Sequence, residues 1–80
     1  MYKLTLLTPE KPFFEGQVSS LIAPGGSGYL EVLTNHCPLL TTLKPGHLTI
    51  TEANGKKLSY EVKGGFLEVS HNHVTILADG

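Results

Sequence analysis

The sequence contains no tryptophan and only one cysteine, Cys37, and its six basic residues are nearly balanced by seven acidic ones. A single cysteine cannot form an internal disulfide, so nothing marks an oxidising compartment. The scattered charges form no cationic stripe that could neutralise a row of phosphates, which argues against nucleic acid as a partner. No apolar run approaches the ~20 residues that a membrane-spanning helix needs. These absences favour a cytosol-facing chain that does not enter a bilayer by itself and whose partners are proteins.

The sequence does contain a regular alternation of apolar and polar residues. Its 80 residues are 40% apolar and 16% charged, which is typical of one folded domain, without a linker or an internal repeat. Apolar residues recur at every second position, and glycine or proline interrupts the chain roughly every eight to twelve residues. The pattern predicts an all-β fold, namely a two-layer β-sandwich or flattened barrel of about 8–10 short, mostly antiparallel strands.

The positions of the strands follow from the same alternation. We expect them near residues 2–8, 13–23, 29–33, 39–43, 47–53, 56–62, 65–70 and 73–78. The first has one apolar face and would tolerate an edge position, and the second is expected to be broken or bulged near Gly16. Asn54-Gly55 is the pair that most readily supplies two positive φ angles in a tight hairpin, and His71-Asn72 predicts a second turn.

Residues that could carry chemistry are few. His71 and His73 beside Asp79 could suggest a metal site, but Asn72 is expected to be the turn itself, which favours ordinary turn histidines. His36 and Cys37 could suggest an activated thiol, yet neighbours in an extended chain point to opposite faces.

The glycine-rich stretch at residues 24–28 neither opens a helix nor carries a lysine, so it does not fit a phosphate-binding loop. No pair of glutamates is placed by a motif for acid–base catalysis. The sequence therefore shows no catalytic residues, cofactor site or metal site.

Aromatic residues near turns are the remaining candidates for partner contacts. Phe13 and Phe14 fit either the core or an interface. Tyr29 opens a strand after a glycine turn, where it could dock against another protein or cover its own sheet.

Several short motifs carry a resemblance to a known family. In chain order they are Thr8-Pro9-Glu10, Phe14-Glu15-Gly16-Gln17-Val18, Ala23-Pro24-Gly25, Asn35-His36-Cys37-Pro38-Leu39-Leu40-Thr41, Leu43-Lys44-Pro45-Gly46, Lys63-Gly64-Gly65-Phe66-Leu67-Glu68-Val69 and Val74-Thr75-Ile76-Leu77-Ala78-Asp79. With these motifs the chain resembles the epsilon subunit of the F-type (rotary, proton-translocating) ATP synthase. Family members commonly continue past Asp79 into two helices, so the resemblance implies one N-terminal β-sandwich domain at 1–80, with the C-terminal helical hairpin absent.

The resemblance also implies a function. It is that of a non-catalytic central-stalk subunit, which couples rotation of the membrane c-subunit ring, driven by proton flow, to the gamma subunit and ATP synthesis. Such a subunit needs no cofactor and touches the membrane only through its partners, at the cytoplasmic face of the bacterial plasma membrane. We find no strong signal for homo-oligomers.

Partner-binding residues are implied position by position. On the side of the c-ring they are Tyr29, Glu31, Asn35 and His36, and on the gamma side they are Thr8, His36 and Thr41. Three positions depart from the family pattern, since Tyr29 stands where an acid is frequent, Glu31 where glycine is common, and Thr34 where proline is frequent. Tyr29 can stack or hydrogen-bond but carries no charge. Glu31, two residues further along, shares its strand face and could supply that charge.

Two alternatives remain open at this stage. One is a free-standing β-sandwich module that binds a ligand or a protein, although a chain without tryptophan is poorly equipped for an aromatic-lined site. The other is a small hydrolase that uses Cys37 and His36. Alkylation of Cys37 would inactivate such an enzyme but leave a docking subunit folded and able to bind.

Overall fold

The chain forms strands throughout the described part. The computed structural model describes residues 1–9, 12–34 and 38–79, and these contain eight strands and no helix. The strands are β1 (Tyr2–Leu7), β2 (Pro12–Gly25), β3 (Gly28–Leu33), β4 (Leu39–Leu43), β5 (Gly46–Glu52), β6 (Lys57–Val62), β7 (Gly65–Ser70) and β8 (His73–Ala78). The all-β prediction is confirmed. Within these residues there is accordingly no helix long and apolar enough to cross a membrane.

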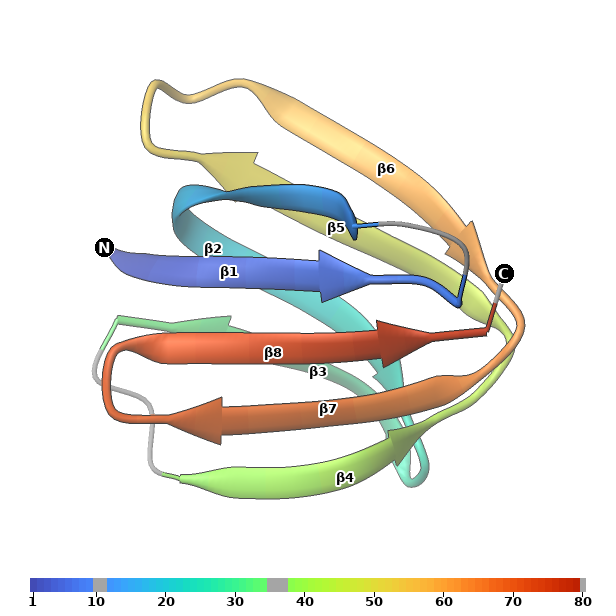
Figure 1. Ribbon diagram of the computed structural model, residues 1–80. Helices are drawn as coiled ribbons and strands as arrows, with labels where there is room; N and C mark the ends of the chain where they lie inside the picture. Colours follow the sequence, from blue (N-terminus) through green and yellow to red (C-terminus); the bar gives the residue numbers. More distant parts are fainter. Residues whose placement is uncertain (10–11, 35–37, 80) are drawn as a thin grey trace.

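The strands are arranged in two layers (Figure 1). In the front layer β1, β8, β7 and β4 lie side by side, while β3, the second half of β2, β5 and β6 form the back layer. The pairing is antiparallel except between β1 and β8, which run parallel. The chain is therefore a β-sandwich with mostly antiparallel strands, as the alternation predicts.

The long strand β2 connects the two layers. Its first half pairs with β1, where Gly16 lies opposite Leu4, and its second half pairs with both β3 and β5. Gly16 itself lies within a regular ladder, and the irregularity expected near it is found on either side: between Pro12 and Phe14 in the pairing with β1, and between Val18 and Ser20 in the pairing with β5. At the second of these shifts, between Val18 and Ser20, β2 leaves one layer and enters the other. A register shift at this point gives the strand the bend that the crossing requires.

The edge-tolerant position expected for the first strand is also not what the structure has. β1 lies between β2 and β8 and is hydrogen-bonded on both sides. Its Lys3 is exposed and its Thr5 half-buried, while Tyr2, Leu4 and Leu6 are buried. The alternation of polarity along β1 therefore indicates that one face of its sheet is exposed to solvent. It does not indicate that β1 lies at the edge of the sheet.

Both hairpins form where the turn residues predict them. In the β5–β6 loop the Gly55 N–H donates to the Glu52 carbonyl (2.9 Å), and the Glu52 N–H donates to the Lys56 carbonyl (2.8 Å). Gly55 has a φ of 92°, but Asn54 has no positive φ, so the expectation of two positive φ angles is wrong. A three-residue loop needs only its last residue in the left-handed region. In the β7–β8 turn Asn72 adopts that conformation, with a φ of 54°.

The core lies between the layers and is apolar. Among the described residues, the Tyr2 hydroxyl is the only polar side-chain group in the core. Each of the eight strands contributes at least one side chain to the core. The buried residues are Tyr2, Leu4, Leu6, Val18, Leu21, Ala23, Val32, Leu43, Leu48, Ile50, Val62, Leu67, Val69, Val74, Ile76 and Ala78, with Phe14, Leu30, Leu39, Leu58 and Tyr60 packed at the margin. The side chains of opposite parity on each strand face outward.

Candidate functional site

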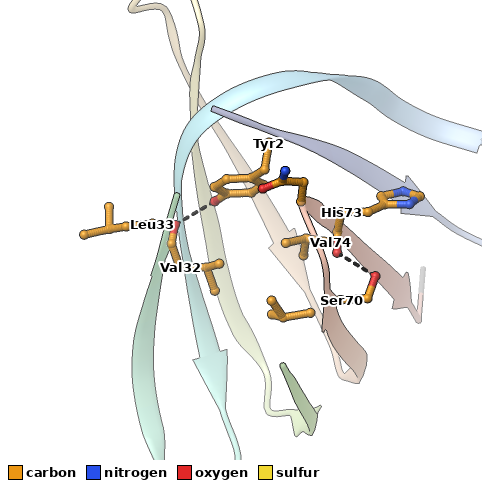
Figure 2. A pocket seen from close by; sticks show the side chains of 8 residues that line it. Tyr2, Val32, Leu33, Ser70, His73 and Val74 are labelled. Carbon is orange, nitrogen blue, oxygen red and sulfur yellow. Dashed lines mark hydrogen bonds between the residues drawn. The ribbon is translucent and has the colours of Figure 1, made fainter. Parts of the chain in front are cut away.

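A crevice beside Tyr2 is too small to hold a ligand. It has a volume of about 10 Å³ and lies where the ends of β1, β3, β7 and β8 meet. Figure 2 shows the Tyr2 ring lying across this crevice, with its hydroxyl pointing toward β3. That volume is at the lower limit for a single water molecule. The crevice is therefore part of the packing and not a binding site.

Tyr2 joins the two layers at this crevice. Its hydroxyl on β1 donates a hydrogen bond of 2.6 Å to the carbonyl of Val32 on β3, and the bond is buried. Burial raises the pKa of Tyr2 above its usual range, and the negative charge of Glu31 adds to the rise. The neutral hydroxyl is thus the stable form at this position, as a buried donor requires.

The outer face of the front layer carries a mostly apolar row, which we call the Phe66 row. It consists of Leu7, Leu77, Phe66 and Thr42, which are direct cross-strand partners on β1, β8, β7 and β4. Phe66 is 55% exposed and Leu77 is 51% exposed. Leu40, one row away on β4, is 72% exposed. Large apolar side chains gathered on one sheet face are typical of a surface that contacts another protein.

A shallow groove of about 310 Å³ lies at one end of the Phe66 row. Its lining is mostly apolar and combines Leu7, Phe66 and Leu77 with Thr8 and Pro9, which follow β1, and with Ala78 and Asp79, which end β8. Thr8, predicted from the sequence as a gamma-side residue, thus lies next to the exposed ring of Phe66. The predicted residue and the exposed apolar row belong to one surface.

The outer face of the back layer carries a second surface, the Tyr29 face. It consists of Tyr29, Glu31 and Leu33, the outward residues of β3, while Leu30 and Val32 point to the core. Tyr29 is 62% exposed and Leu33 is 51% exposed. The structure therefore brings Tyr29 and Glu31 together on one face, as the spacing of two residues predicts.

The other predicted partner residues are not joined to these surfaces by the structure. Thr41 is half-buried and shares its strand face with Leu39 and Leu43, which pack toward the core. Its hydroxyl donates to the carbonyl of Thr42 at 3.3 Å. Asn35 and His36 lie outside the described residues, as does Cys37, so the partner contacts predicted for this corner stay predictions.

The histidines of the last hairpin have ordinary surroundings. His73 is half-buried, and its Nε2 lies 3.0 Å from the Thr5 hydroxyl on the neighbouring strand. His71 lies in the turn that precedes β8, whereas Asp79 follows the end of β8. Within residues 1–9, 12–34 and 38–79, no three acidic, histidine or cysteine side chains are grouped in a way that could hold a metal ion.

Sequence reasoning missed the Phe66 row. Alternation along β7 places Phe66 and Glu68 on one strand face and Leu67 and Val69 on the other, but alternation alone does not say which of these two faces is exposed. Phe66 and Leu77 point outward because Leu67 and Ile76 already occupy the core positions, with no exposed surface. The signal that could have found the row is the register of three strand pairs, which alternation within one strand does not contain.

The whole chain matches a known protein family. The family described as "ATP synthase, Delta/Epsilon chain, beta-sandwich domain" matches residues 1–80. The ATP synthase epsilon chain of Protochlamydia amoebophila is 46% identical over 79 residues, which cover 99% of this chain and 54% of the relative. The ATP synthase epsilon chain of Chlorobium limicola is 40% identical over 78 residues, covering 98% of this chain and 89% of the relative. The chain thus spans about half the length of some curated relatives and most of the length of others.

Solved structures share the fold. A chain in the mitochondrial ATP synthase of Euglena gracilis, solved with its F1 part and c-ring, superposes with a TM-score of 0.88 at 28% identity, covering 94% of this chain and 48% of that one. A chain in the central stalk and c-ring of the Tetrahymena thermophila mitochondrial ATP synthase gives a TM-score of 0.80 at 26% identity, covering 98% of this chain and 63% of that one. Both similar chains are therefore β-sandwich components of ATP synthase assemblies.

Proposed function

Because this chain belongs to the family of ATP synthase delta/epsilon-chain β-sandwich domains, we propose that it is a non-catalytic subunit of the central stalk. In this role it couples rotation of the c-subunit ring, driven by proton flow, to the gamma subunit and so to ATP synthesis. It acts as a connecting piece and needs no cofactor for that role. Its place is the cytoplasmic face of the bacterial plasma membrane, which it reaches through its partner subunits.

The observation that carries this proposal is the presence of large exposed apolar side chains on two opposite sides of the sandwich. The Phe66 row lies on the outer face of the front layer, and the Tyr29 face lies on the outer face of the back layer. Packed β-layers are about 10 Å apart and share one interdigitated core. A chain of this shape can hold two partners at once, one on each side, without bending between them.

We assign one partner to each surface. The Phe66 row, together with Thr8 in its groove, faces the gamma subunit, and the Tyr29 face with Glu31 faces the c-ring. Thr41 belongs to the gamma side, Asn35 to the c-ring side, and His36 to both. Binding to two partners at once raises the lifetime of the attachment well above that of either contact alone.

The test is a reconstitution with an ATP synthase from which this chain has been removed. We expect ATP synthesis under an imposed proton gradient to be lost and to return when the chain is added back. ATP hydrolysis by the detached catalytic head should persist without the chain. The proposal fails if synthesis is as fast without the chain as with it.

A direct binding measurement accompanies the reconstitution. The chain, immobilised through an added tag, should capture both the purified gamma subunit and the detergent-solubilised c-ring. An unrelated β-sandwich domain of similar size is the control and should capture neither. Capture of neither partner by this chain would contradict the assignment as a stalk subunit.

A further inference from the structure

The exposed side chain of Tyr29 is hydrogen-bonded to β5, which lies on the far side of β2 from β3. Its hydroxyl accepts a hydrogen bond from the backbone N–H of His47 at the start of β5, with a length of 3.3 Å. Tyr29 is also the cross-strand partner of Pro24 on β2. The aromatic side chain therefore reaches from β3 over β2 to β5, with more than half of its surface still exposed.

Gly46 provides the space in which the Tyr29 hydroxyl rests. A Cβ atom at position 46 would lie 2.6 Å from that hydroxyl oxygen and 2.9 Å from the Cβ of Pro24. Such separations are shorter than van der Waals contact between these atoms. The φ angle of Gly46 lies outside the positive range, so the backbone conformation does not require glycine here. The lack of a side chain is thus needed for the placement of Tyr29 and Pro24.

We propose that Gly46 is a positioning residue that fixes Tyr29 as a preorganised, uncharged anchor for the c-ring. The inference rests on the proposed function and names the way in which this chain makes that contact. An aromatic side chain that is already fixed loses little conformational freedom on binding, so more of its contact energy contributes to affinity. The hydroxyl oxygen accepts its hydrogen bond from His47, so the exposed ring surface and the hydroxyl proton remain for contact with the c-ring.

On this face, a neutral side chain and a charged one each contribute to the proposed affinity for the c-ring. Glu31 is exposed on the same face and carries the charge, whereas Tyr29 carries none. Salt screens the interaction of exposed charges but not the stacking of an aromatic side chain. We therefore expect the part of the c-ring affinity that depends on Gly46 to be the same at low and at high ionic strength.

The experiment measures binding of Gly46→Ala to the purified c-ring and, separately, to the purified gamma subunit. We expect affinity for the c-ring to fall about tenfold, which corresponds to about 1.4 kcal/mol, at both ionic strengths. Affinity for gamma should stay within about twofold of wild type, since the Phe66 row lies on the other layer. In a Tyr29→Leu background the glycine substitution should cause no further loss of c-ring affinity, because its effect acts through Tyr29.

Tyr29→Phe is the second variant. If Gly46→Ala does not fold, this variant tests whether the fixed position of Tyr29 contributes to c-ring binding. It keeps the aromatic side chain and removes the hydroxyl that His47 holds, so it should weaken c-ring binding about threefold without affecting gamma binding. The inference is overturned if c-ring affinity is unchanged in both variants, if gamma and c-ring affinity fall together, or if the effects of the Gly46 and Tyr29 substitutions simply add. If the wild-type chain binds neither partner, it is the proposed function that fails.

Discussion

At the scale of single residues, Tyr2 is the one buried side chain of the described core that makes a hydrogen bond between the layers. Its ring lies beside Val32, Val69 and Val74 at one end of the core, and its hydroxyl donates to the Val32 carbonyl. A buried carbonyl that loses its donor carries a desolvation cost in addition to the lost bond. Tyr2 therefore stabilises the closure of the sandwich at the end where β1 begins.

Replacement of this hydroxyl gives the first prediction. Tyr2→Phe keeps the ring but leaves the Val32 carbonyl without its partner, so the free energy of unfolding should fall by about 1–2 kcal/mol. Urea denaturation, monitored by circular dichroism, measures this change in the free energy of unfolding. Tyr29→Phe, which removes an exposed hydroxyl, is the matched control and should cost less than about 0.5 kcal/mol. Equal losses in the two variants would show that the buried bond contributes nothing beyond an exposed one.

The raised pKa of Tyr2 predicts a dependence of stability on pH. In the unfolded chain this tyrosine titrates near 10.0, whereas in the folded chain burial, and then the charge of Glu31, hold its pKa higher. The contribution of Tyr2 is thus complete below pH 10 and declines as the pH rises above it, because only the unfolded state then releases the proton. Urea denaturation at about pH 8 and about pH 11 should show a smaller decline for Tyr2→Phe than for wild type. If wild type and Tyr2→Phe lost the same stability between these pH values, the predicted contribution of Tyr2 would be refuted.

At the scale of elements, the hairpins and the ends of the strands depend on a few backbone positions. Gly65 begins β7 with a φ of 138°, and a side chain there would collide with the Leu77 carbonyl on β8. Gly55 has a φ of 92° in the β5–β6 loop, but nothing lies within 4 Å of where its side chain would be. The first position is restricted by both conformation and space, and the second by conformation alone.

Alanine substitutions at these two glycines separate the effect of backbone conformation from the effect of limited space. Gly55→Ala should lower the free energy of unfolding by about 1 kcal/mol, through backbone strain. Gly65→Ala should lower it by about 2 kcal/mol or more, because strand β8 must also shift. Thermal and urea denaturation of both variants measure the difference. A loss at Gly65 no larger than that at Gly55 would mean that the close approach of β7 and β8 is easily relaxed.

At the scale of the whole molecule, the sandwich is a small, densely packed body with large apolar side chains exposed on its two outer faces. The principal extents are 26 × 24 × 17 Å, and one apolar core fills the space between the layers. Bending such a body would require core side chains to separate, which densely packed interiors resist. A body of this kind can transmit a force from one outer face to the other, which is what a coupling subunit requires.

Two leucines with equal exposure test the assignment of the faces. Leu77, in the Phe66 row, and Leu33, on the Tyr29 face, are each 51% exposed. Leu77→Ser should weaken binding to gamma by about tenfold and leave c-ring binding unchanged, while Leu33→Ser should do the reverse. Both variants should keep their stability within about 0.5 kcal/mol of wild type. If both substitutions weakened the same interaction, the division of partners between the two faces would be wrong.

The candidate site was only partly predictable from the sequence. Tyr29 and Glu31 could be placed on one strand face because side chains two residues apart in a strand point the same way. Phe66 and Leu77 could not be joined into one row, because they meet across strands whose pairing register is set by turns and by core packing. For the same reason Thr8 could not be placed next to Phe66, from which it is separated by most of the chain.

The sequence by itself determined the strand positions, the turn residues and the all-β class, because each depends on local conformational preference and on alternation of polarity within a strand. Only the tertiary structure decided that β1 is an interior strand, that β2 crosses between the layers near Val18, and that apolar side chains gather on two opposite outer faces. These features depend on which strands pair and in what register. Register is fixed by the packing of the complete core, and no short segment of the chain contains that information.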